Sequence, residues 1–377
     1  MTKVLVVSHT YVTPMNQRKL QAMVRSGLDV SLITPSIVKD TLREIKLSVL
    51  EGAGFKVFPV RSYFGRHHSL RIYNQRDLRR AISEIKPDFM LVEQEPYSLS
   101  TYQVMREKKR FGFKTLLFTF QNIFKNYPPP FSVIESRNLK LADHLIVGNR
   151  DAGLVWERKG MSPTKITVLP QVGVDFDEFF ATDKSQAKAL RNLRRFTVGY
   201  AGRFVEEKGL QVLLSAMAQL KDLPITLGLV GRGPYKAQLE KQIAQLELKG
   251  SVEFIEGVTH EQMPQLMNCF DLFVLPSLTR KHWREQFGHV LIEAMACGVP
   301  CIGTATDPID EVIGDGGFTF KEGDSSDLAK KIRRAFNSPE ELRSLSIQAI
   351  KRVEENYTNA AIAAEILKLI DRVRGQE

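Results

Sequence analysis

Short apolar runs alternate with amphipathic stretches along nearly the whole chain. Apolar runs of about four to eight residues between turn-forming residues are typical of buried strands, and apolar positions three and four apart are typical of helices. This alternation predicts an α/β protein with doubly wound parallel sheets. Strands are expected at residues 4–7, 30–33, 57–60, 89–92, 115–118, 144–147, 166–169, 197–201, 226–230, 252–255, 272–275 and 300–303.

The alternation of apolar runs and amphipathic stretches is interrupted once, near the middle of the chain. A polar and charged stretch at 182–195 separates the two halves, and 377 residues are enough for two domains. We therefore expect a Rossmann-like domain over 1–175, a linker over 176–195 and a second Rossmann-like domain over 196–359. The final segment, 360–377, is predicted to be a helix that packs back on the first domain. Two such domains facing each other would form a cleft at the carboxyl ends of their strands, where ligands bind.

Composition and charge limit the classes of protein to which the chain can belong. Apolar residues make up 43% and charged residues 25% of the chain, which is typical of a soluble globular protein. The amino terminus lacks the features of a signal peptide, and no apolar run is long enough to span a bilayer, so a cytoplasmic location is expected. The net charge of +10 calls for an anionic partner. The basic and aromatic segment 61–80 suits peripheral contact with the inner face of the plasma membrane, or equally a solvated loop leading into a helix.

The first candidate motif joins the strand at 197–201 to the following helix. Gly202 leaves room for a ligand close to the backbone, and Arg203 lies in the same loop. Lys208 lies where the helix begins, a position that the helix dipole makes unfavourable for a cation unless an anion compensates it. Arg203 and Lys208 are therefore predicted to hold a diphosphate. The alternative is a solvated loop with ordinary charges.

The second candidate motif is the turn Gly231-Arg232-Gly233 after the strand at 226–230. It contains half of a dinucleotide-binding fingerprint, since no third glycine follows at the expected spacing. An ordinary strand-to-helix turn fits as well. In a nucleotide site, Gly231 and Arg232 would lie near the base or the ribose.

The third candidate motif is a predicted helix that begins near Phe287. The amides of Phe287, Gly288 and His289 would be free at the helix start to hold phosphate or sugar oxygens. Glu285 and Glu293 offer carboxylates that accept hydrogen bonds from hydroxyl groups. Because nearly all neighbours of Glu293 on the helix are apolar, its carboxylate is expected to be buried and to need a partner.

Together the three motifs resemble those of the retaining glycosyltransferases of family four, which have the GT-B fold. The string Glu-x-Phe-Gly-x4-Glu-Ala-Met-Ala-Cys-Gly-x-Pro at 285–300 carries most of this resemblance. It implies that Arg203 and Lys208 hold the diphosphate of the donor, that Glu285 contacts the donor sugar and that Glu293 binds the ribose. Arg203, Lys208 and Glu285 are then the expected catalytic residues. No metal is required where two cations can neutralise the diphosphate, and no cofactor is expected.

The first half departs from the family pattern. The Gly-Gly turn common after the first strand is replaced here by the sequence of residues 9–17, and the donor-facing histidine by residues 119–122. Polar side chains in these and neighbouring loops are candidates for acceptor binding, although each is also compatible with an ordinary surface position. They are His9, Asn16, Glu95, Gln121, Asn122 and Lys125.

The expected activity is transfer of a hexose from a nucleotide-diphosphate sugar to a glycan or lipid-linked saccharide in polysaccharide biosynthesis. UDP-glucose is the favoured donor because it is common in the family. One alternative is a nucleotide-sugar epimerase of the same fold. Another is a basic polyanion-binding protein without activity, although the chain lacks nucleic-acid recognition modules and such a role would not explain Glu285 and Glu293. No nucleic-acid partner is expected.

Overall fold

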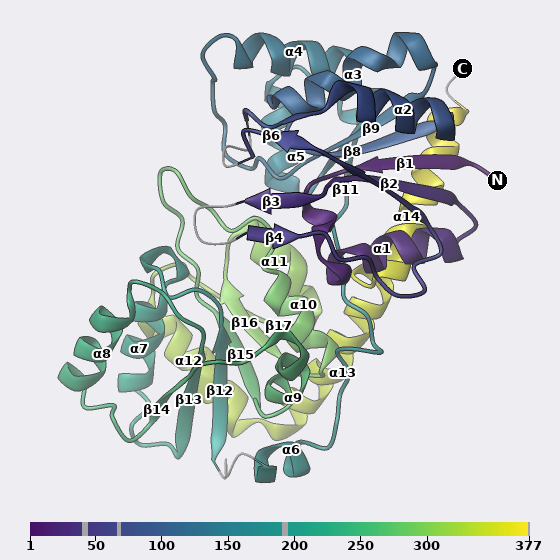
Figure 1. Cartoon of the computed structure of the whole chain (residues 1–377). Helices are drawn as coiled ribbons and strands as arrows, with labels where there is room; N and C mark the ends of the chain where they lie inside the picture. The colour runs from purple at the N-terminus through teal and green to yellow at the C-terminus, as the bar shows by residue number, and fades with distance from the viewer. Residues whose placement is uncertain (40–43, 66–68, 191–194, 376–377) are drawn as a thin grey trace. The chain divides into compact units, whose positions relative to one another are not determined.

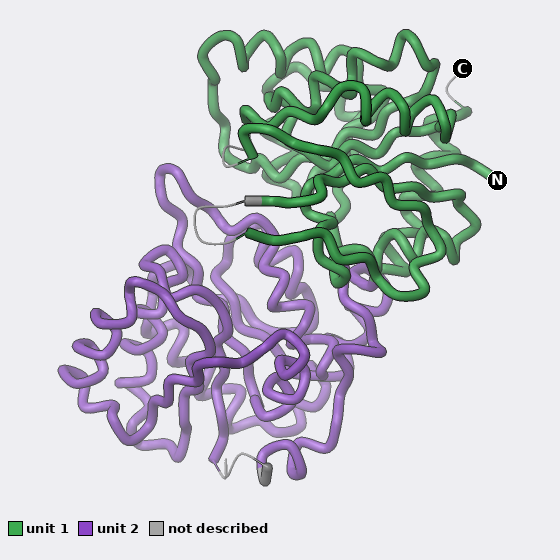
Figure 2. The backbone as a smooth tube through the Cα atoms, viewed as in Figure 1, with its two compact units in different colours: residues 1–172, 359–377 green, residues 173–358 purple. Residues whose placement is uncertain are grey.

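The structure is a computed structural model that describes residues 1–39, 44–65, 69–190 and 195–375 (Figure 1). The chain forms two compact units (Figure 2). The first unit contains Met1–Val172 and Asn359–Glu377, and the second contains Gly173–Thr358. Each unit has a parallel sheet covered by helices, so the predicted α/β class with two Rossmann-like domains is confirmed.

The first unit is built on a seven-stranded parallel sheet with the order β11-β10-β9-β8-β1-β2-β5. Its strands occur at the predicted places, because runs of β-branched and other apolar residues are buried on both faces of a parallel sheet. The burial of all five residues of β8 illustrates this. The strands are β1 (Lys3–Val7), β2 (Asp29–Pro35), β5 (Lys56–Val60), β8 (Phe89–Glu93), β9 (Lys114–Thr119), β10 (His144–Val147) and β11 (Ile166–Val168).

Helices cover both faces of this sheet because side chains alternate along each strand. Val4 and Val6 of β1 pack in one cluster with α1 and α14, whereas Leu5 and Val7 pack in another with α2, α3 and α5. Figure 1 shows α14, from the end of the chain, beside α1. The helices are α1 (Pro14–Arg25), α2 (Gln75–Ile85), α3 (Leu99–Phe111), α4 (Phe131–Leu141), α5 (Arg150–Arg158) and α14 (Asn359–Arg374), with 3-10 turns η1 (Thr10–Val12) and η2 (Pro163–Lys165).

Two small antiparallel hairpins in the first unit were not predicted. They pair β3 (Ile37–Lys39) with β4 (Glu44–Lys46), and β6 (Ser62–Tyr63) with β7 (Ile72–Tyr73). Strands of two or three residues are too short to show an alternating pattern. Among the described residues, no helix combines the length and the apolar character needed to cross a membrane.

The second unit has a six-stranded parallel sheet with the order β14-β13-β12-β15-β16-β17. Five of these strands lie where the sequence predicts them. The sixth, at the sheet edge, was missed because glycine and threonine interrupt its apolar run and three of its four residues are only partly buried. The strands are β12 (Phe196–Ala201), β13 (Ile225–Val230), β14 (Val252–Ile255), β15 (Leu272–Leu275), β16 (Cys301–Thr304) and β17 (Gly317–Phe320).

The helices of the second unit share one core cluster with its sheet. We expected a linker at 176–195, but its described residues, 176–190 and 195, belong to this unit: they include α6, and Phe179 is buried in the core. The helices are α6 (Lys184–Leu190), α7 (Leu210–Ala218), α8 (Lys236–Gln245), α9 (Met263–Met267), α10 (His289–Ala296), α11 (Asp307–Ile313), α12 (Ser325–Asn337) and α13 (Pro339–Asn356), with 3-10 turns η3 (Glu206–Lys208), η4 (His260–Gln262) and η5 (Gly314–Gly316).

Candidate functional site

Two loops in the second unit lie against each other at the carboxyl ends of the neighbouring parallel strands β12 and β13. The amide of Gly202 donates a hydrogen bond to Val230 O at 2.9 Å, and that of Phe204 donates to Arg232 O at 2.9 Å. A Cβ atom on Gly231 would lie 1.9 Å from Gly202 O, and the φ angle of Gly231 is +138°. Glycine is therefore required at position 231 for the loops to meet. The structure thus brings Gly202 and Gly231 together at the sheet edge where ligands of such folds bind.

Arg203 and Arg232 follow these glycines on the two joined loops, and both are exposed. Within the ranges that the structure describes, neither guanidinium has a hydrogen-bond or ion-pair partner. Each guanidinium carries five donors in a planar fork that matches phosphate oxygens. The geometry therefore offers an anion two cations on neighbouring loops.

Lys208 differs from these arginines because it already has a counter-charge. Its Nζ lies 2.5 Å from Glu285 Oε2, which also accepts a hydrogen bond from Ser277 Oγ at 2.8 Å. The side chains of Lys208 and Glu285 are 15% and 13% exposed. The sequence argument required a bound anion to compensate Lys208 at the start of a helix, but in the structure Glu285 supplies that charge. The predicted catalytic residues Lys208 and Glu285 are thus in direct contact.

A close backbone approach explains why Lys208 meets Glu285. Gly209 has a φ angle of +69°, and a Cβ atom there would lie 1.8 Å from Pro276 O. The amide of Leu278 donates to Glu207 O at 2.7 Å. These contacts hold the turn that carries Lys208 against the chain after β15, which leads to Glu285.

Tyr200 connects this ion pair to the Arg203 loop. Its hydroxyl donates to Arg203 O at 3.0 Å. Burial raises the pKa of Tyr200, the charge of Glu285 raises it further, and the charge of Arg203 lowers it. Tyr200 thus holds the backbone of the Arg203 loop, and its hydroxyl responds to the charges of both Arg203 and Glu285.

The helix α10 begins after Gly288, whose φ angle of +79° favours glycine. Glu293 is 14% exposed, and its Oε1 lies 3.1 Å from His289 Nδ1. The buried carboxylate of Glu293 was expected to have a partner, and that partner is the side chain of His289. From the sequence, we had assigned a role only to the backbone amide of His289. Within the described residues, His289 Nε2 is buried without a hydrogen-bond partner. The ring of Phe287 packs edge-on against Tyr357 at 5.7 Å.

A second histidine lies near Glu293 and was missed in the sequence. His260 Nε2 lies 2.8 Å from Glu178 Oε1. The neighbouring Glu178 carboxylate raises the pKa of His260 and Glu293 adds to the effect, although burial opposes it. No motif surrounds His260, so its place beside the third candidate motif is visible only in three dimensions.

In the first unit, the structure brings Glu95 and Gln121 together around Thr119. Glu95 accepts hydrogen bonds from Thr119 Oγ1 at 2.6 Å and from the Phe120 amide at 3.1 Å, while the Gln121 amide donates to Thr119 Oγ1 at 3.1 Å. Burial raises the pKa of Glu95. Asn122, the next residue, is buried as well. These three candidates share one sheet edge, at the carboxyl ends of β8 and β9.

The other acceptor candidates lie elsewhere in the loops of the first unit. His9 lies directly before η1, and Asn16 lies in the first turn of α1, where its Nδ2 donates to Thr10 O at 2.8 Å. Lys125 is exposed. The side chain of Asn16 therefore stabilises a turn, and Lys125 is open to solvent.

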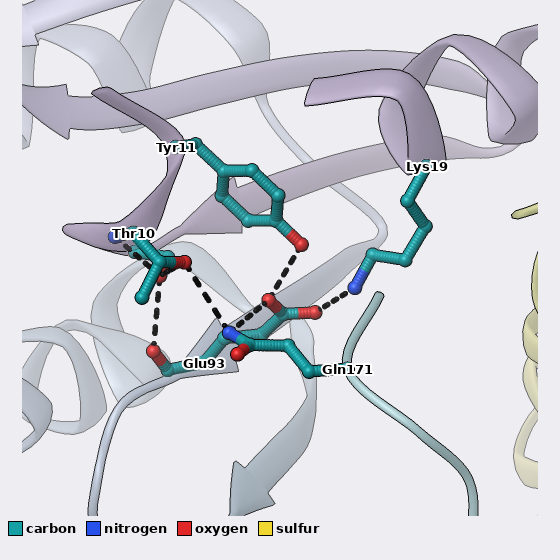
Figure 3. A network of polar contacts seen from close by, with 6 residues as sticks. Thr10, Tyr11, Lys19, Glu93 and Gln171 are labelled. Atoms are coloured by element: carbon teal, nitrogen blue, oxygen red, sulfur yellow. Dashed lines mark hydrogen bonds and ion pairs between the residues drawn. The ribbon is translucent and has the colours of Figure 1, made fainter. Parts of the chain in front are cut away.

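A buried polar network at the end of β8 was not predicted (Figure 3). Glu93 pairs with Lys19, and the two residues are 3% and 1% exposed. Tyr11 Oη donates to Glu93 Oε2 at 2.6 Å and Gln171 Nε2 donates to the same oxygen at 2.9 Å. Figure 3 shows Tyr11 and Lys19 pointing toward the Glu93 carboxylate. Burial lowers the pKa of Lys19 and raises that of Tyr11.

Comparison with solved structures identifies the architecture. Anabaena HepE in complex with UDP superposes with a TM-score of 0.72, over 99% of this chain and 100% of that one, at 19% sequence identity. The chain has the GT-B fold. Residues 181–352, nearly the whole second unit of this GT-B chain, match the family model described as "Glycosyl transferases group 1".

Sequence similarity to two bacterial proteins covers part of the GT-B chain. The chain is 32% identical to the "Putative glycosyltransferase EpsF" of Bacillus subtilis (strain 168) over 200 residues, which cover 50% of this chain and 50% of EpsF. It is 27% identical to the "Capsular polysaccharide biosynthesis glycosyltransferase CapM" of Staphylococcus aureus over 294 residues, 73% of this chain and 70% of CapM. The matched part of the chain thus spans about half the length of EpsF and 70% of the length of CapM.

Proposed function

We propose that the protein is a retaining glycosyltransferase that transfers a hexose from a UDP-sugar, with UDP-glucose as the favoured donor. The acceptor is a glycan or a lipid-linked saccharide in polysaccharide biosynthesis. The family match in the second unit, the name of CapM and the structures of HepE with UDP and with UDP-glucose support this proposal. The observation that carries it is the pair of glycine-joined loops: they present Arg203 and Arg232, which have no hydrogen-bond or ion-pair partner among the described residues, in the unit where Lys208 contacts Glu285.

Departure of the nucleotide places negative charge on its diphosphate. Arg203 and Arg232 bind the diphosphate oxygens, and Lys208 donates its remaining N–H groups to them while Glu285 holds it in place. Donors that are already oriented before the reaction stabilise this charge without reorganising, by about 3 kcal/mol each. Transfer then depends on the two arginines and on the orientation of Lys208 more than on any nucleophile of the protein.

The two glutamates take different parts of the donor in this proposal. Glu285, fixed by Lys208 and Ser277, accepts a hydrogen bond from a hydroxyl of the sugar. Glu293, oriented by His289, accepts hydrogen bonds from the ribose hydroxyls. The amides at the start of α10 add donors for the phosphate.

The acceptor lies against the first unit in this proposal. Gln121 and Asn122 bind its hydroxyl groups, and Glu95 keeps them in place through Thr119 and the Phe120 amide. His9, Asn16 and Lys125 extend the acceptor surface.

The donor is tested by measuring thermal stabilisation with UDP-, GDP- and ADP-glucose and with UDP-galactose, since ligands that bind the native state raise its melting temperature. We expect stabilisation by UDP-glucose and transfer to an acceptor saccharide with an α-linked product, read from the anomeric proton in NMR spectra. The proposal would be refuted if none of the nucleotide sugars raised the melting temperature. Conversion of the donor to its epimer without an acceptor would replace the transferase by an epimerase.

A further inference from the structure

A short hairpin in the second unit lies between β15 and Glu285. The amide of Arg280 donates a hydrogen bond to Trp283 O at 2.8 Å, and the amide of Trp283 donates to Arg280 O at 3.2 Å. Only Lys281 and His282 separate this pair, and both are exposed. The reciprocal hydrogen bonds therefore fix the backbone of Trp283 two residues before Glu285.

The same hairpin is joined to the turn η3, which carries Lys208. The amide of Leu278, just before the hairpin, donates to Glu207 O at 2.7 Å. Arg280 Nη2 lies 3.0 Å from Glu206 Oε1. This ion pair is exposed and adds little stability, but together with the backbone hydrogen bond it keeps the hairpin beside η3.

Trp283 reaches Lys208 across this junction. Lys208 Nζ lies 5.2 Å from the centroid of the Trp283 ring, within the range of a cation–π contact, for which tryptophan is the best aromatic partner. The tryptophan is half-buried and the lysine side chain is 15% exposed, so solvent weakens the contact less than at an open surface. Lys208 thus contacts both the Glu285 carboxylate, at 2.5 Å, and an aromatic ring.

The two partners restrain Lys208 in different ways. A lysine ammonium group is a point charge on a flexible stem, so a contact with Glu285 alone would let Nζ turn about that carboxylate. The ring of Trp283 attracts the cation through its quadrupole and carries no net charge, so it restricts Nζ without neutralising it. An ammonium group has three N–H donors, and these two partners leave one for a phosphate oxygen.

We propose that Trp283 is a positioning residue, which holds Lys208 in the orientation in which its remaining N–H group meets the diphosphate of the donor. The identity of this ligand, a nucleotide diphosphate, rests on the proposed function. Trp283 acts through Lys208 and does not itself bind the donor. Because the charge on the diphosphate grows as the nucleotide leaves, the effect of Trp283 appears in turnover more than in donor affinity.

The first test removes the aromatic face and measures release of UDP from UDP-glucose, with and without an added glucoside as acceptor. Trp283→Leu should lower kcat about tenfold and change UDP affinity in a calorimetric titration by less than about threefold. Trp283→Phe keeps a ring and should recover most of the loss. The matched control is His282→Leu, which alters the exposed neighbour and should leave kcat unchanged. Weaker binding of UDP-glucose by Trp283→Leu at unchanged kcat would show that the ring contacts the donor itself and would overturn the proposal.

A fluorine series separates electrostatics from packing. Trp156→Phe leaves Trp283 as the only tryptophan, so biosynthetic incorporation of tryptophans with increasing numbers of fluorine atoms weakens the attraction of this one ring for a cation with little change in shape. We expect kcat to fall stepwise with fluorination at a constant melting temperature. Equal kcat for all fluorinated proteins would overturn the proposal. If Trp156→Phe fails to fold, the comparison of leucine with phenylalanine at position 283 still decides the question.

A double replacement tests whether Trp283 acts through Lys208. In a Lys208→Met background, Trp283→Leu should cause no further loss of kcat, because the group that the ring positions is gone. The same fold loss in both backgrounds would overturn the proposal. A wild type that neither binds UDP nor releases it from UDP-glucose would refute the proposed function, and the role of Trp283 with it. A wild type that does both, but is matched by Trp283→Leu in kcat, would refute only the role of Trp283.

Discussion

Replacement of Lys19 by methionine removes the ammonium group that pairs with Glu93 while keeping most of the buried stem. Tyr11 and Gln171 still donate hydrogen bonds to the carboxylate at 2.6 and 2.9 Å, but its charge loses the partner in a site that is almost closed to solvent. Breaking a buried ion pair by removing one partner costs about 3–5 kcal/mol. We expect the free energy of unfolding of the first unit to fall by that amount. This corresponds to a more than hundredfold change in its unfolding equilibrium constant.

The two tryptophans of the chain make this loss measurable for one unit alone. Trp156 is buried in the first unit and Trp283 lies in the second, so Trp283→Phe leaves Trp156 as the sole tryptophan reporter. Urea unfolding followed by Trp156 fluorescence gives the midpoint, and an unchanged slope allows conversion to a free energy. Lys109→Met, on the exposed side of α3, is the control and should change stability by less than about 0.5 kcal/mol.

A double replacement tests the reasoning further. Glu93→Gln combined with Lys19→Met removes both charges and keeps an oxygen for Tyr11, so it should recover at least half of the loss caused by Lys19→Met alone. A loss below about 1 kcal/mol for Lys19→Met, or additive effects in the double variant, would refute the ion pair as described.

Five other variants test the donor site and the stability of the first unit. Arg203→Ala and Lys208→Ala should lower turnover by about a hundredfold each and change UDP affinity less, whereas Glu293→Ala should chiefly weaken UDP binding in a calorimetric titration. Gly231→Ala places a Cβ atom 1.9 Å from Gly202 O and should reduce UDP binding at least tenfold. Burial lowers the pKa of His144 from 6.5 to about 4, so the unfolded chain takes up the proton first as the pH falls. The contribution of neutral His144 to the free energy of unfolding is complete above pH 6.5 and is lost as the pH falls toward 4, by up to about 3 kcal/mol. His144→Gln should remove this pH dependence when unfolding is followed by Trp156 fluorescence.

Matched controls keep these outcomes interpretable. Arg343→Ala removes an exposed arginine from α13 and should leave turnover and UDP affinity unchanged. Gly250→Ala adds a methyl group to open space and should bind UDP normally. Equal losses in these controls and in the site variants would argue against the donor site, and a His144→Gln variant with the wild-type pH dependence would contradict the assignment to His144.

The parts of the fold that were predictable are those that depend on local patterns. Strands such as β15 and residues 89–92 of β8 are continuous apolar runs, and the order of such runs is enough for the α/β class. Edge strand β17 and the short hairpins lack such runs. The segment 176–195 was interpreted as a linker because residues 182–195 are polar, but the burial of Phe179 in the core and the presence of α6 assign its described residues to the second unit.

The site could be predicted where its residues follow each other in the chain, and not where they meet across it. The glycine loops and α10 are contiguous strings. Lys208, by contrast, meets Glu285 across 77 positions, and Lys19 meets Glu93 across 74. Helix-dipole reasoning showed that Lys208 needs a negative partner, but it has no means of choosing between a ligand and a distant carboxylate.

The first unit is closed by the last helix of the chain. Its core combines Val4 and Leu91 with Ile362, Ile366 and Ile370 of α14, so β1 and β8 are synthesised well before the helix that completes their core. The second unit is continuous, and all of it precedes α14. During synthesis, the second unit therefore has its complete core before the first, where the apolar sheet face that α14 covers waits until α14 has been made. Loss of α14 would disrupt the unit that contains the amino terminus and leave the neighbouring unit with all of its residues.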